Sequence, residues 1–383
     1  MREGQSNSAT LGLPQVDKAV YSVAIIFTMS SFPFSRPSSP AAKCLHLIRL
    51  RELTSRSELV KDTHLSQPTI TRAVAALVKA GYVTERTDLT RAAGRGRPTV
   101  PLELSEPRAL HAGIAVGTLS TYIALFDLKG RTVRSVDIDV EVADESQDDF
   151  IQRIMATLNR LTTGVSRPLA TVGVTTSGSV TGDGEVYAPN LGWRDAEIGA
   201  QLREQFSVPV VVTSAAAAIV GSEIQSSPSL NDEAVLALFA DDSIGCALAT
   251  EEGVLPIAVT RDDLTTQGLI DAIGEPSIRT LRDAVTDSAH KHTTRGALDD
   301  RAHQLGELAA QLSSQHAPST IVVAGSAFID DPLAPAPFAR SVRGAGIDVE
   351  LRMIPTHREV VRDIARAVAL DFVLREPLAV ASP

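Results

Sequence analysis

Apolar residues recur at helical spacing in three separate stretches near the start of the chain. Ser39-Pro40 opens the first of them, because a serine hydroxyl caps a helix and a proline at the first helical position gives up only an unbonded N–H. Apolar side chains then follow at i, i+3, i+4 and i+7: Ala41, Cys44, Leu45 and Ile48. This spacing predicts an amphipathic helix that begins at residue 40.

Two more helices and two strands complete this N-terminal module. A short helix is predicted from Arg56 to Asp62, and His64 is expected to take the left-handed conformation in the turn that follows. Ser66 caps a third helix, whose buried stripe consists of Ile70, Val74, Leu77 and Val78. Strands are predicted over residues 82–87 and 99–104. Three helices followed by a two-stranded hairpin are typical of a winged helix-turn-helix.

Beyond residue 108 the pattern changes to strands that alternate with helices. Two apolar strands lie between Leu110 and Asp127, and a third runs from Thr132 to Val142. A helix from Phe150 to Leu161 and a strand from Ala170 to Thr175 follow. This order predicts an α/β fold that opens with an actin-like, ribonuclease-H-type lobe.

These patterns divide the chain into five predicted parts. Residues 1–38 are expected to be a disordered leader and linker, since Ser30 to Ser39 is rich in Ser and Pro. The others are a winged helix-turn-helix (39–107), a first lobe (108–231), a second lobe (232–356), and a C-terminal helix and tail that pack back on the first lobe (357–383). Within the leader, Met29 is a candidate initiator, and Lys18 before the apolar run Ala19 to Met29 leaves a signal peptide as an alternative.

Charge is distributed unevenly between the module and the body. The whole chain has a net charge of −10, but residues 1–107 carry 14 Lys and Arg against 9 Asp and Glu, so that the remainder carries −15. A basic module on an acidic body favours a protein that presents only its N-terminal part to DNA phosphates. The two cysteines form no disulfide framework, and no apolar run approaches the roughly 20 residues that cross a bilayer, so a cytoplasmic protein is expected.

The third helix is the predicted recognition helix, whose first turns meet base edges in the major groove. Gln pairs with adenine, Arg with guanine or phosphate, and Thr with bases or the thymine methyl group. The candidate contacts on this helix are Ser66, Gln67, Thr69, Thr71 and Arg72. The alternative is a solvated face that binds another protein.

The predicted wing adds a second candidate DNA contact. Its loop contains Gly94-Arg95-Gly96-Arg97-Pro98, in which glycines let the backbone approach and arginines can enter a narrow minor groove. The candidate contacts in the loop are Arg91, Arg95, Gly96 and Arg97. Double-stranded DNA is therefore the expected partner.

The sequence resembles the ROK family of repressors and sugar kinases, in its regulator branch. The resemblance rests on the winged helix-turn-helix with its Gly-Arg-Gly-Arg-Pro loop, on Ala188 to Trp193, on Val208 to Val212, on Ile321 to Gly325, and on Ala365 to Pro377. It implies a two-lobed ATPase-type body and a function as a transcriptional regulator, with repression as the expected effect. It also implies a homodimer or tetramer that binds two half-sites of DNA.

The departures from the family pattern remove its catalytic groups. Ala115 stands where the kinases carry a phosphate-site acid, and Ala215 stands where they carry the general base, which an alanine cannot replace. The second phosphate loop reads Asp241-Asp242-Ser243-Ile244-Gly245, whose charge would repel a nucleotide. Thr260 to Asp287 contains none of the His and Cys of the family zinc site. We therefore expect no catalytic residue, no metal and no cofactor; an active sugar kinase or a protein-interaction adaptor are the alternatives.

A relic of the sugar pocket is the remaining candidate site. By resemblance, Asn190 would hydrogen-bond a sugar-like effector, with Thr176, Ser177 and Ser214 nearby. The alternative is that Asn190 and Trp193 persist only for the turn and its packing. If a ligand binds, closure of the lobes around Ser227 to Asp232 is expected to change the spacing between two DNA-binding modules.

Overall fold

The computed structural model describes residues 33–90, 99–106, 108–230 and 234–380. Its N-terminal part contains the three helices and the hairpin that the sequence predicts, and we call residues 39–104 the reader. The helices are α2 (Pro40–Leu50), α3 (Arg56–Thr63) and α4 (Gln67–Lys79). Antiparallel strands β1 (Val83–Glu85) and β2 (Leu102–Leu104) form the hairpin, with the short turn η1 (Thr87–Leu89) after β1.

The caps of these helices follow the sequence closely. Ser39 and Ser66 cap α2 and α4 through their side chains, and His64 ends α3 in the left-handed conformation with a φ of 56°. One prediction for the buried stripe of α4 is wrong: Val78 is 36% exposed, and Ala73 is buried with Ile70, Val74 and Leu77 instead. The reason is that Val78 lies one position beyond the stripe that faces α2 and α3.

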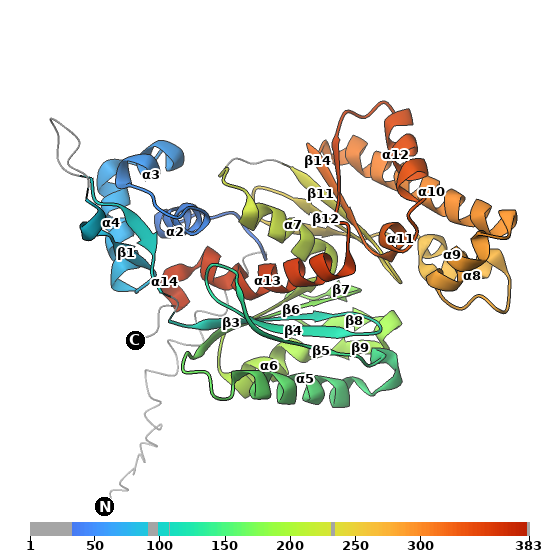
Figure 1. Cartoon of the computed structure of the whole chain (residues 1–383), viewed down its shortest axis with the longest axis horizontal. Helices are drawn as coiled ribbons and strands as arrows, with labels where there is room; N and C mark the ends of the chain where they lie inside the picture. The colour runs from blue at the N-terminus through green and yellow to red at the C-terminus, as the bar shows by residue number, and fades with distance from the viewer. Residues whose placement is uncertain (1–32, 91–98, 107, 231–233, 381–383) are drawn as a thin grey trace, which may run out of the picture. The chain divides into compact units, whose positions relative to one another are not determined.

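The first lobe is built on a five-stranded sheet in the order β10-β6-β3-β4-β5. Helices α5 (Gln147–Thr162) and α6 (Ile198–Phe206) cover one face, and a small sheet of β7, β8 and β9 extends the lobe (Figure 1). The strands of the main sheet are β3 (Leu110–Val116), β4 (Thr121–Phe126), β5 (Thr132–Ile138), β6 (Leu169–Thr176) and β10 (Val210–Ser214). Those of the small sheet are β7 (Ser179–Val180), β8 (Val186–Ala188) and β9 (Trp193–Ala196). The short turns η2 (Val142–Asp144) and η3 (Pro189–Leu191) lie in the connecting loops.

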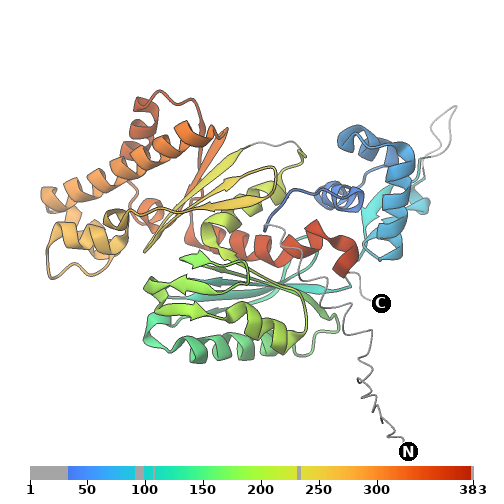
Figure 2. The ribbon, with the colours of Figure 1, turned by 180° about the vertical axis from the view of Figure 1, so that it is seen from behind.

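The second lobe has its own five-stranded sheet in the order β13-β12-β11-β14-β15. Helices α10 and α12 pack on it, and α8 and α9 lie against α10 (Figure 2). The strands are β11 (Val235–Ala240), β12 (Ile244–Ala249), β13 (Val254–Ile257), β14 (Thr320–Ala324) and β15 (Glu350–Met353). The helices are α8 (Thr266–Ile273), α9 (Leu281–Ser288), α10 (His292–His316), α11 (Ser326–Ile329) and α12 (Pro335–Gly344), with the turn η4 (Asp262–Leu264) before α8.

Helices α7 (Ala215–Ser226) and α13 (His357–Arg375) lie between the two large sheets (Figures 1 and 2). Helix α13 rests directly on β3 and β6, because both strands carry a glycine where it touches them. A Cβ at Gly113 would lie 2.1 Å from the carbonyl oxygen of Ala365, and one at Gly173 would lie 2.3 Å from the backbone of Val368. The short helix α14 (Pro377–Val380) follows and contacts the reader.

The predicted flexible linker is wrong for its last part. Phe34 is 2% exposed and belongs to the apolar cluster between the two sheets, rather than to a solvated segment. The Ser- and Pro-rich composition suggested a linker, but a single phenylalanine with a prepared site is enough to hold the segment in place. Within the described ranges, no helix is both long and apolar enough to span a membrane.

Candidate nucleic-acid interface and ligand cleft

The recognition helix presents the predicted polar residues on one accessible side. Gln67, Thr71 and Arg72 are exposed, whereas the opposite side of α4 is buried against α2 and α3. Among the described residues, Arg72 hydrogen-bonds only within its own helix, where Nε donates to the carbonyl oxygen of Pro68 at 3.4 Å. Within the described part of the chain, its terminal nitrogens and the Gln67 side-chain amide make no hydrogen bond or ion pair, so they are available for a ligand.

Ser66 and Thr69 serve the helix start as well as the candidate interface. The backbone N–H of Thr69 donates to Ser66 Oγ at 3.3 Å, and the two hydroxyl oxygens lie 2.8 Å apart. Thr71 Oγ1 donates to the carbonyl oxygen of Gln67 at 2.9 Å. These bonds fix the first turn of α4, in which the N–H of Thr69 is taken by Ser66 and Pro68 has no N–H to offer a phosphate.

The four predicted wing contacts, Arg91, Arg95, Gly96 and Arg97, lie outside the described residues. The base of the wing is described, and it contains a residue that the sequence reasoning missed. Arg86 donates through Nε and Nη2 to Asp88 at 2.8 and 2.6 Å, and through Nη1 to Glu103 at 2.5 Å. Hydrogen bonds to these two carboxylates raise the pKa of Arg86. Its position between a strand and a basic loop was the available signal.

The predicted effector residues come together in the first lobe. Ser177 Oγ donates to Asn190 Oδ1 at 3.0 Å, and Thr176 pairs with Ser214 across the parallel strands β6 and β10. Ser214 also caps α7, accepting from the N–H of Ala217 at 3.2 Å. Thr176 is fully buried, and its hydroxyl has no hydrogen-bond partner among the described residues.

The surroundings of Asn190 also fit the alternative in which Asn190 and Trp193 persist only for the turn and its packing. It sits in η3, whose last turn ends at Gly192 in the left-handed conformation with a φ of 70°. Trp193 follows, fully buried, with its ring 6.2 Å from that of Phe150. One motif thus builds the turn, fills the core and presents an amide, so the geometry is compatible with both interpretations.

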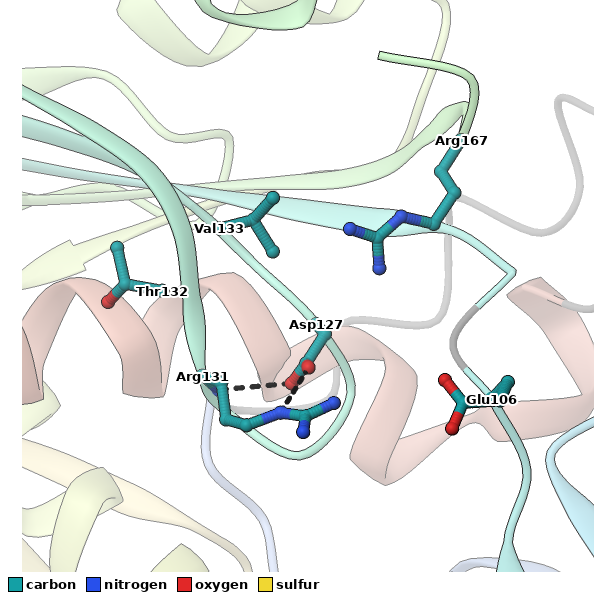
Figure 3. Close-up of a pocket in the computed structure, with 6 residues that line it drawn as sticks. All are labelled: Glu106, Asp127, Arg131, Thr132, Val133 and Arg167. Atoms are coloured by element: carbon teal, nitrogen blue, oxygen red, sulfur yellow. Dashed lines mark hydrogen bonds and ion pairs between the residues drawn. The ribbon is translucent and has the colours of Figure 1, made fainter.

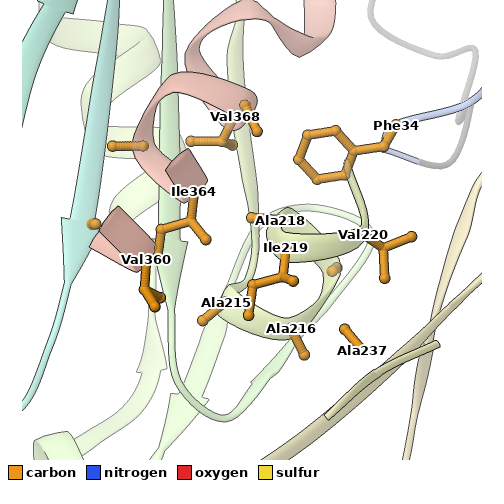
Figure 4. Packing of buried hydrophobic residues seen from close by; sticks show 14 of the residues in the cluster. Phe34, Ala215, Ala216, Ala218, Ile219, Val220, Ala237, Val360, Ile364 and Val368 are labelled. Atoms are coloured by element: carbon orange, nitrogen blue, oxygen red, sulfur yellow. The ribbon is translucent and has the colours of Figure 1, made fainter. Parts of the chain in front are cut away.

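The two alanines that are predicted to replace the catalytic carboxylates are part of an apolar core. Ala115 and Ala215 are 4% and 8% exposed and belong to one cluster with Val360 and Ile364 of α13 (Figure 4). Ala115 has Tyr122 and Thr175 as its strand neighbours, and neither hydroxyl has a partner among the described residues. Both alanines are therefore buried where an ionised carboxylate would be costly without partners, although the Tyr122 and Thr175 hydroxyls lie beside Ala115.

The acidic loop between β11 and β12 closes on the turn after β14. Ser326 Oγ donates to an oxygen of Asp241, and Arg301 donates to the carbonyl oxygen of Asp241 at 3.3 Å. Burial raises the pKa of the Asp241 carboxyl group. Gly325 before Ser326 has a φ of 107°, and a Cβ there would lie 2.2 Å from the Ala240 carbonyl oxygen. The loop and the turn are therefore held together by hydrogen bonds to Asp241 and by the close approach at Gly325.

A shallow pocket of about 520 Å³ lies beside the turn between β4 and β5, and none of the predicted site residues lines it. Its lining is mostly charged (Figure 3) and consists of Glu106, Asp127, Arg131, Thr132, Val133 and Arg167. Arg131 Nε donates to Asp127 at 2.7 Å and holds the turn between β4 and β5. Leu128 in that turn packs with the reader core, so the pocket borders the junction of reader and body. Across the described ranges, no group of three or more His, Cys, Asp or Glu is placed to hold a metal.

Known proteins share both the sequence and the fold of this chain. The model of the ROK family matches residues 111–254. Proteins named transcriptional regulators from Mycobacterium tuberculosis and Mycobacterium bovis are each 30% identical over 340 residues, covering 77% of this chain and 76% of their own length.

Solved structures extend the comparison to the whole fold. A ROK family transcriptional regulator, described as a homologue of the E. coli Mlc protein, superposes with a TM-score of 0.71 at 18% identity, covering 89% of this chain and 98% of its own. A ROK glucokinase from Streptomyces griseus gives 0.56 at 15% identity, covering 69% of this chain and 99% of its own. The part of this chain that the glucokinase does not cover is comparable in length to the reader together with the segment before it. By the match to the ROK family model, together with its identity to the mycobacterial regulators over three quarters of its length, this chain belongs to the ROK family.

Proposed function

We propose that this chain is a DNA-binding transcriptional regulator whose kinase-like body has lost catalysis. The observation that carries the proposal is the exposed polar side of α4, where Gln67, Thr71 and Arg72 stand on a helix whose other side is buried. The mycobacterial relatives are named transcriptional regulators, which supports this assignment. Such a protein acts in the cytoplasm on double-stranded DNA, and repression is the effect we expect.

The proposed DNA contact combines two elements. The first turns of α4 read bases in the major groove through Gln67 and Arg72, while Thr71 contacts a base or phosphate. Arg95 and Arg97 of the wing enter the adjacent minor groove, and Arg91 binds phosphate. Arg86, tied to Asp88 and Glu103, holds the base of the wing in position.

The loss of catalysis is supported by the packing around Ala115 and Ala215. A general base must lie within hydrogen-bonding reach of the sugar hydroxyl, and a methyl group cannot accept its proton. The hydrogen bond between Ser326 and Asp241 supports the view that the loop at the former nucleotide site is stable without a ligand. The body then serves to pair two copies, so that two readers meet two half-sites, and to sense a sugar-like effector at Ser177, Asn190 and Ser214.

Selection from random DNA tests the proposal without knowledge of the operator. The full chain, immobilised, is incubated with a pool of random duplexes, and the retained DNA is sequenced after several rounds. We expect a short motif that appears twice in inverted orientation. A pool without any shared motif would contradict sequence-specific binding, and a single unrepeated motif would contradict the paired arrangement. Arg340→Ala, an exposed arginine of the second lobe, is the control that should leave the motif unchanged.

A further inference from the structure

The segment before α2 is anchored by its backbone to the body. The N–H of Phe34 donates to Asp371 Oδ1 at 2.8 Å, and Asp371 is 1% exposed on α13. Arg375 holds the same carboxylate through Nε at 3.0 Å and Nη2 at 2.9 Å. Phe34 takes a left-handed backbone conformation with a φ of 58°, which is unusual for a bulky residue and indicates a constrained position.

The aromatic ring of Phe34 has a site prepared by a glycine. A Cβ at Gly221 of α7 would lie 2.3 to 2.5 Å from atoms of the ring, so only glycine fits beneath it. Figure 4 shows the ring beside α7, with Val220 and Val368 nearby. The same apolar cluster includes Ala237 and Val254 of the second lobe. Phe34 therefore packs in the layer that joins the two sheets.

The residue before Phe34 is bonded to the other lobe. The carbonyl oxygen of Pro33 accepts from the N–H of Val254 in β13 at 3.1 Å. Two adjacent residues thus connect to different parts of the body: Pro33 to the second sheet, and Phe34 to α13, which rests on the first sheet. Only four residues separate Phe34 from Ser39, the cap of α2. We call Pro33 and Phe34 the strap.

Helix α2 makes its own contacts with the point where the chain crosses between the lobes. His46 Nε2 donates to the carbonyl oxygen of Ser227 at 2.8 Å, and Arg49 donates to that of Gln225. Gln225 in turn donates to the carbonyl oxygen of Ala367 in α13 at 2.9 Å. Ser227 follows the end of α7, at the start of the hinge predicted from the sequence. The reader is therefore connected to both lobes through the strap, and to the crossing between them through α2.

We propose that Phe34 is a positioning residue which, through the strap, makes the orientation of the reader depend on the angle between the two lobes. A rotation of the second lobe would pull on Pro33 through β13 and shift the adjacent Phe34 in its seat on α7 and α13. The strain would pass through the four intervening residues to α2. This inference rests on the proposed function for its biological meaning, because the reader is where DNA would bind.

Distances within the free protein test the strap directly. Nitroxide labels at Lys79→Cys on α4 and His303→Cys on α10 report the separation of reader and second lobe by pulsed electron paramagnetic resonance; both sites are exposed. The native Cys44 and Cys246 are buried, and burial raises the pKa of their thiols to about 11 and about 12, so they react little with the label. We expect one narrow distance distribution for the otherwise unaltered chain.

Two strap variants should broaden this distribution roughly twofold or add a second population. Phe34→Leu leaves part of the space beside α7 unfilled. Gly221→Ala keeps Phe34 but displaces its ring, because the new methyl group would lie 2.3 to 2.5 Å from ring atoms. If Phe34→Leu folds poorly, Gly221→Ala tests the strap instead. The matched controls are Phe150→Leu, an equally buried phenylalanine of the first lobe, and Gly182→Ala, where a Cβ meets nothing within 4 Å. Both controls should keep the original width.

Two results would overturn the proposal: unchanged widths in folded strap variants, or equal broadening in Phe150→Leu. The measurement uses no DNA, so it stands even if the proposed function fails. Arg72→Ala distinguishes a failure of the strap proposal from a failure of the proposed function, because this variant should lose DNA affinity and keep the narrow distance distribution. On a selected operator, the strap variants should bind roughly tenfold more weakly with an unchanged salt slope, because the number of phosphate contacts stays the same.

Discussion

Arg72 is a candidate interface residue whose exposure could be predicted from the sequence. Its exposure follows from the spacing of Ile70, Val74 and Leu77, which fixes the buried side of α4. Ser66 and His64 were likewise predictable, because a cap and a left-handed turn have strong local preferences. Phe34 and His46 were not, since their partners Asp371 and Ser227 lie 337 and 181 residues away and leave no local pattern.

The Arg72→Ala substitution should weaken binding to a selected operator by about 1–3 kcal/mol. The protein should remain as stable as before, because the side chain is exposed and bonds only to its own helix. Fluorescence anisotropy with the selected duplex measures the effect, and Arg340→Ala serves as the control. Equal affinities for Arg72→Ala and the parent protein would remove Arg72 from the interface.

His46 should make the protein sensitive to acid. Burial, with smaller effects of Arg49 and Arg36, lowers its pKa from 6.5 to about 4, and burial does the same for His111. The unfolded chain therefore binds more protons than the folded one between these two values. The stabilisation is complete above pH 6.5 and is lost as the pH falls towards 4, by on the order of 2 kcal/mol for each histidine at the lower end.

Urea denaturation at pH 7 and pH 4.5 checks this expectation. His46→Gln keeps an amide donor for the Ser227 carbonyl oxygen and cannot take up a proton. We expect its free energy of unfolding to fall by about 2 kcal/mol less than that of the parent protein between the two pH values. An identical fall in both proteins would mean that His46 titrates normally in the folded state.

Among the elements, α13 shows what periodicity alone cannot predict. The family resemblance places a closing helix at Ala365 to Pro377, and apolar patterns predict the strands from β1 to β6, with ends shifted by a few residues. The seat of α13 on β3 and β6 depends on Gly113 and Gly173, which meet the backbone of Ala365 and Val368 far along the chain. A glycine inside a strand signals a close approach, but the sequence does not say which element approaches.

Gly113→Ala should therefore separate α13 from the first sheet. The new methyl group would lie 2.1 Å from a backbone oxygen, which cannot move without displacing the helix. We expect the free energy of unfolding to fall by roughly 2 kcal/mol or more. Urea denaturation gives the value, with Gly182→Ala as the neutral control. A stability equal to that of the parent protein would show that α13 is not packed as closely as described here.

At the scale of the whole molecule, an acidic body with an apolar centre carries a basic reader. The charge asymmetry and the missing acids could be read from the sequence, because both are matters of residue type. That Ala115 and Ala215 share one core with Val360 and Ile364 could not, since it depends on how α13 closes over α7. The remaining polar groups at Ser177 and Asn190 bond to each other, a pairing that only the fold reveals.

Restoring a carboxylate at the general-base position should cost stability and give no kinase. In Ala215→Asp the new group would be buried beside Val360 and Ile364, and its desolvation should cost about 2 kcal/mol even after the favourable helix N-terminus is counted. Thermal unfolding measures the loss, with Ala200→Asp on the exposed side of α6 as the control. Sugar-dependent ADP formation by the variant would contradict the view that packing has replaced the catalytic centre.

The central claim is that this chain binds specific DNA through its reader. Fluorescence anisotropy of the purified protein on the DNA upstream of its own gene, titrated across salt concentrations, tests it most directly. We expect an affinity roughly a thousandfold above that for random DNA, and the logarithm of the affinity should fall linearly with the logarithm of the salt concentration. The Arg95→Ala, Arg97→Ala double variant should bind more weakly with a shallower slope. An affinity no higher than for random DNA would contradict the account.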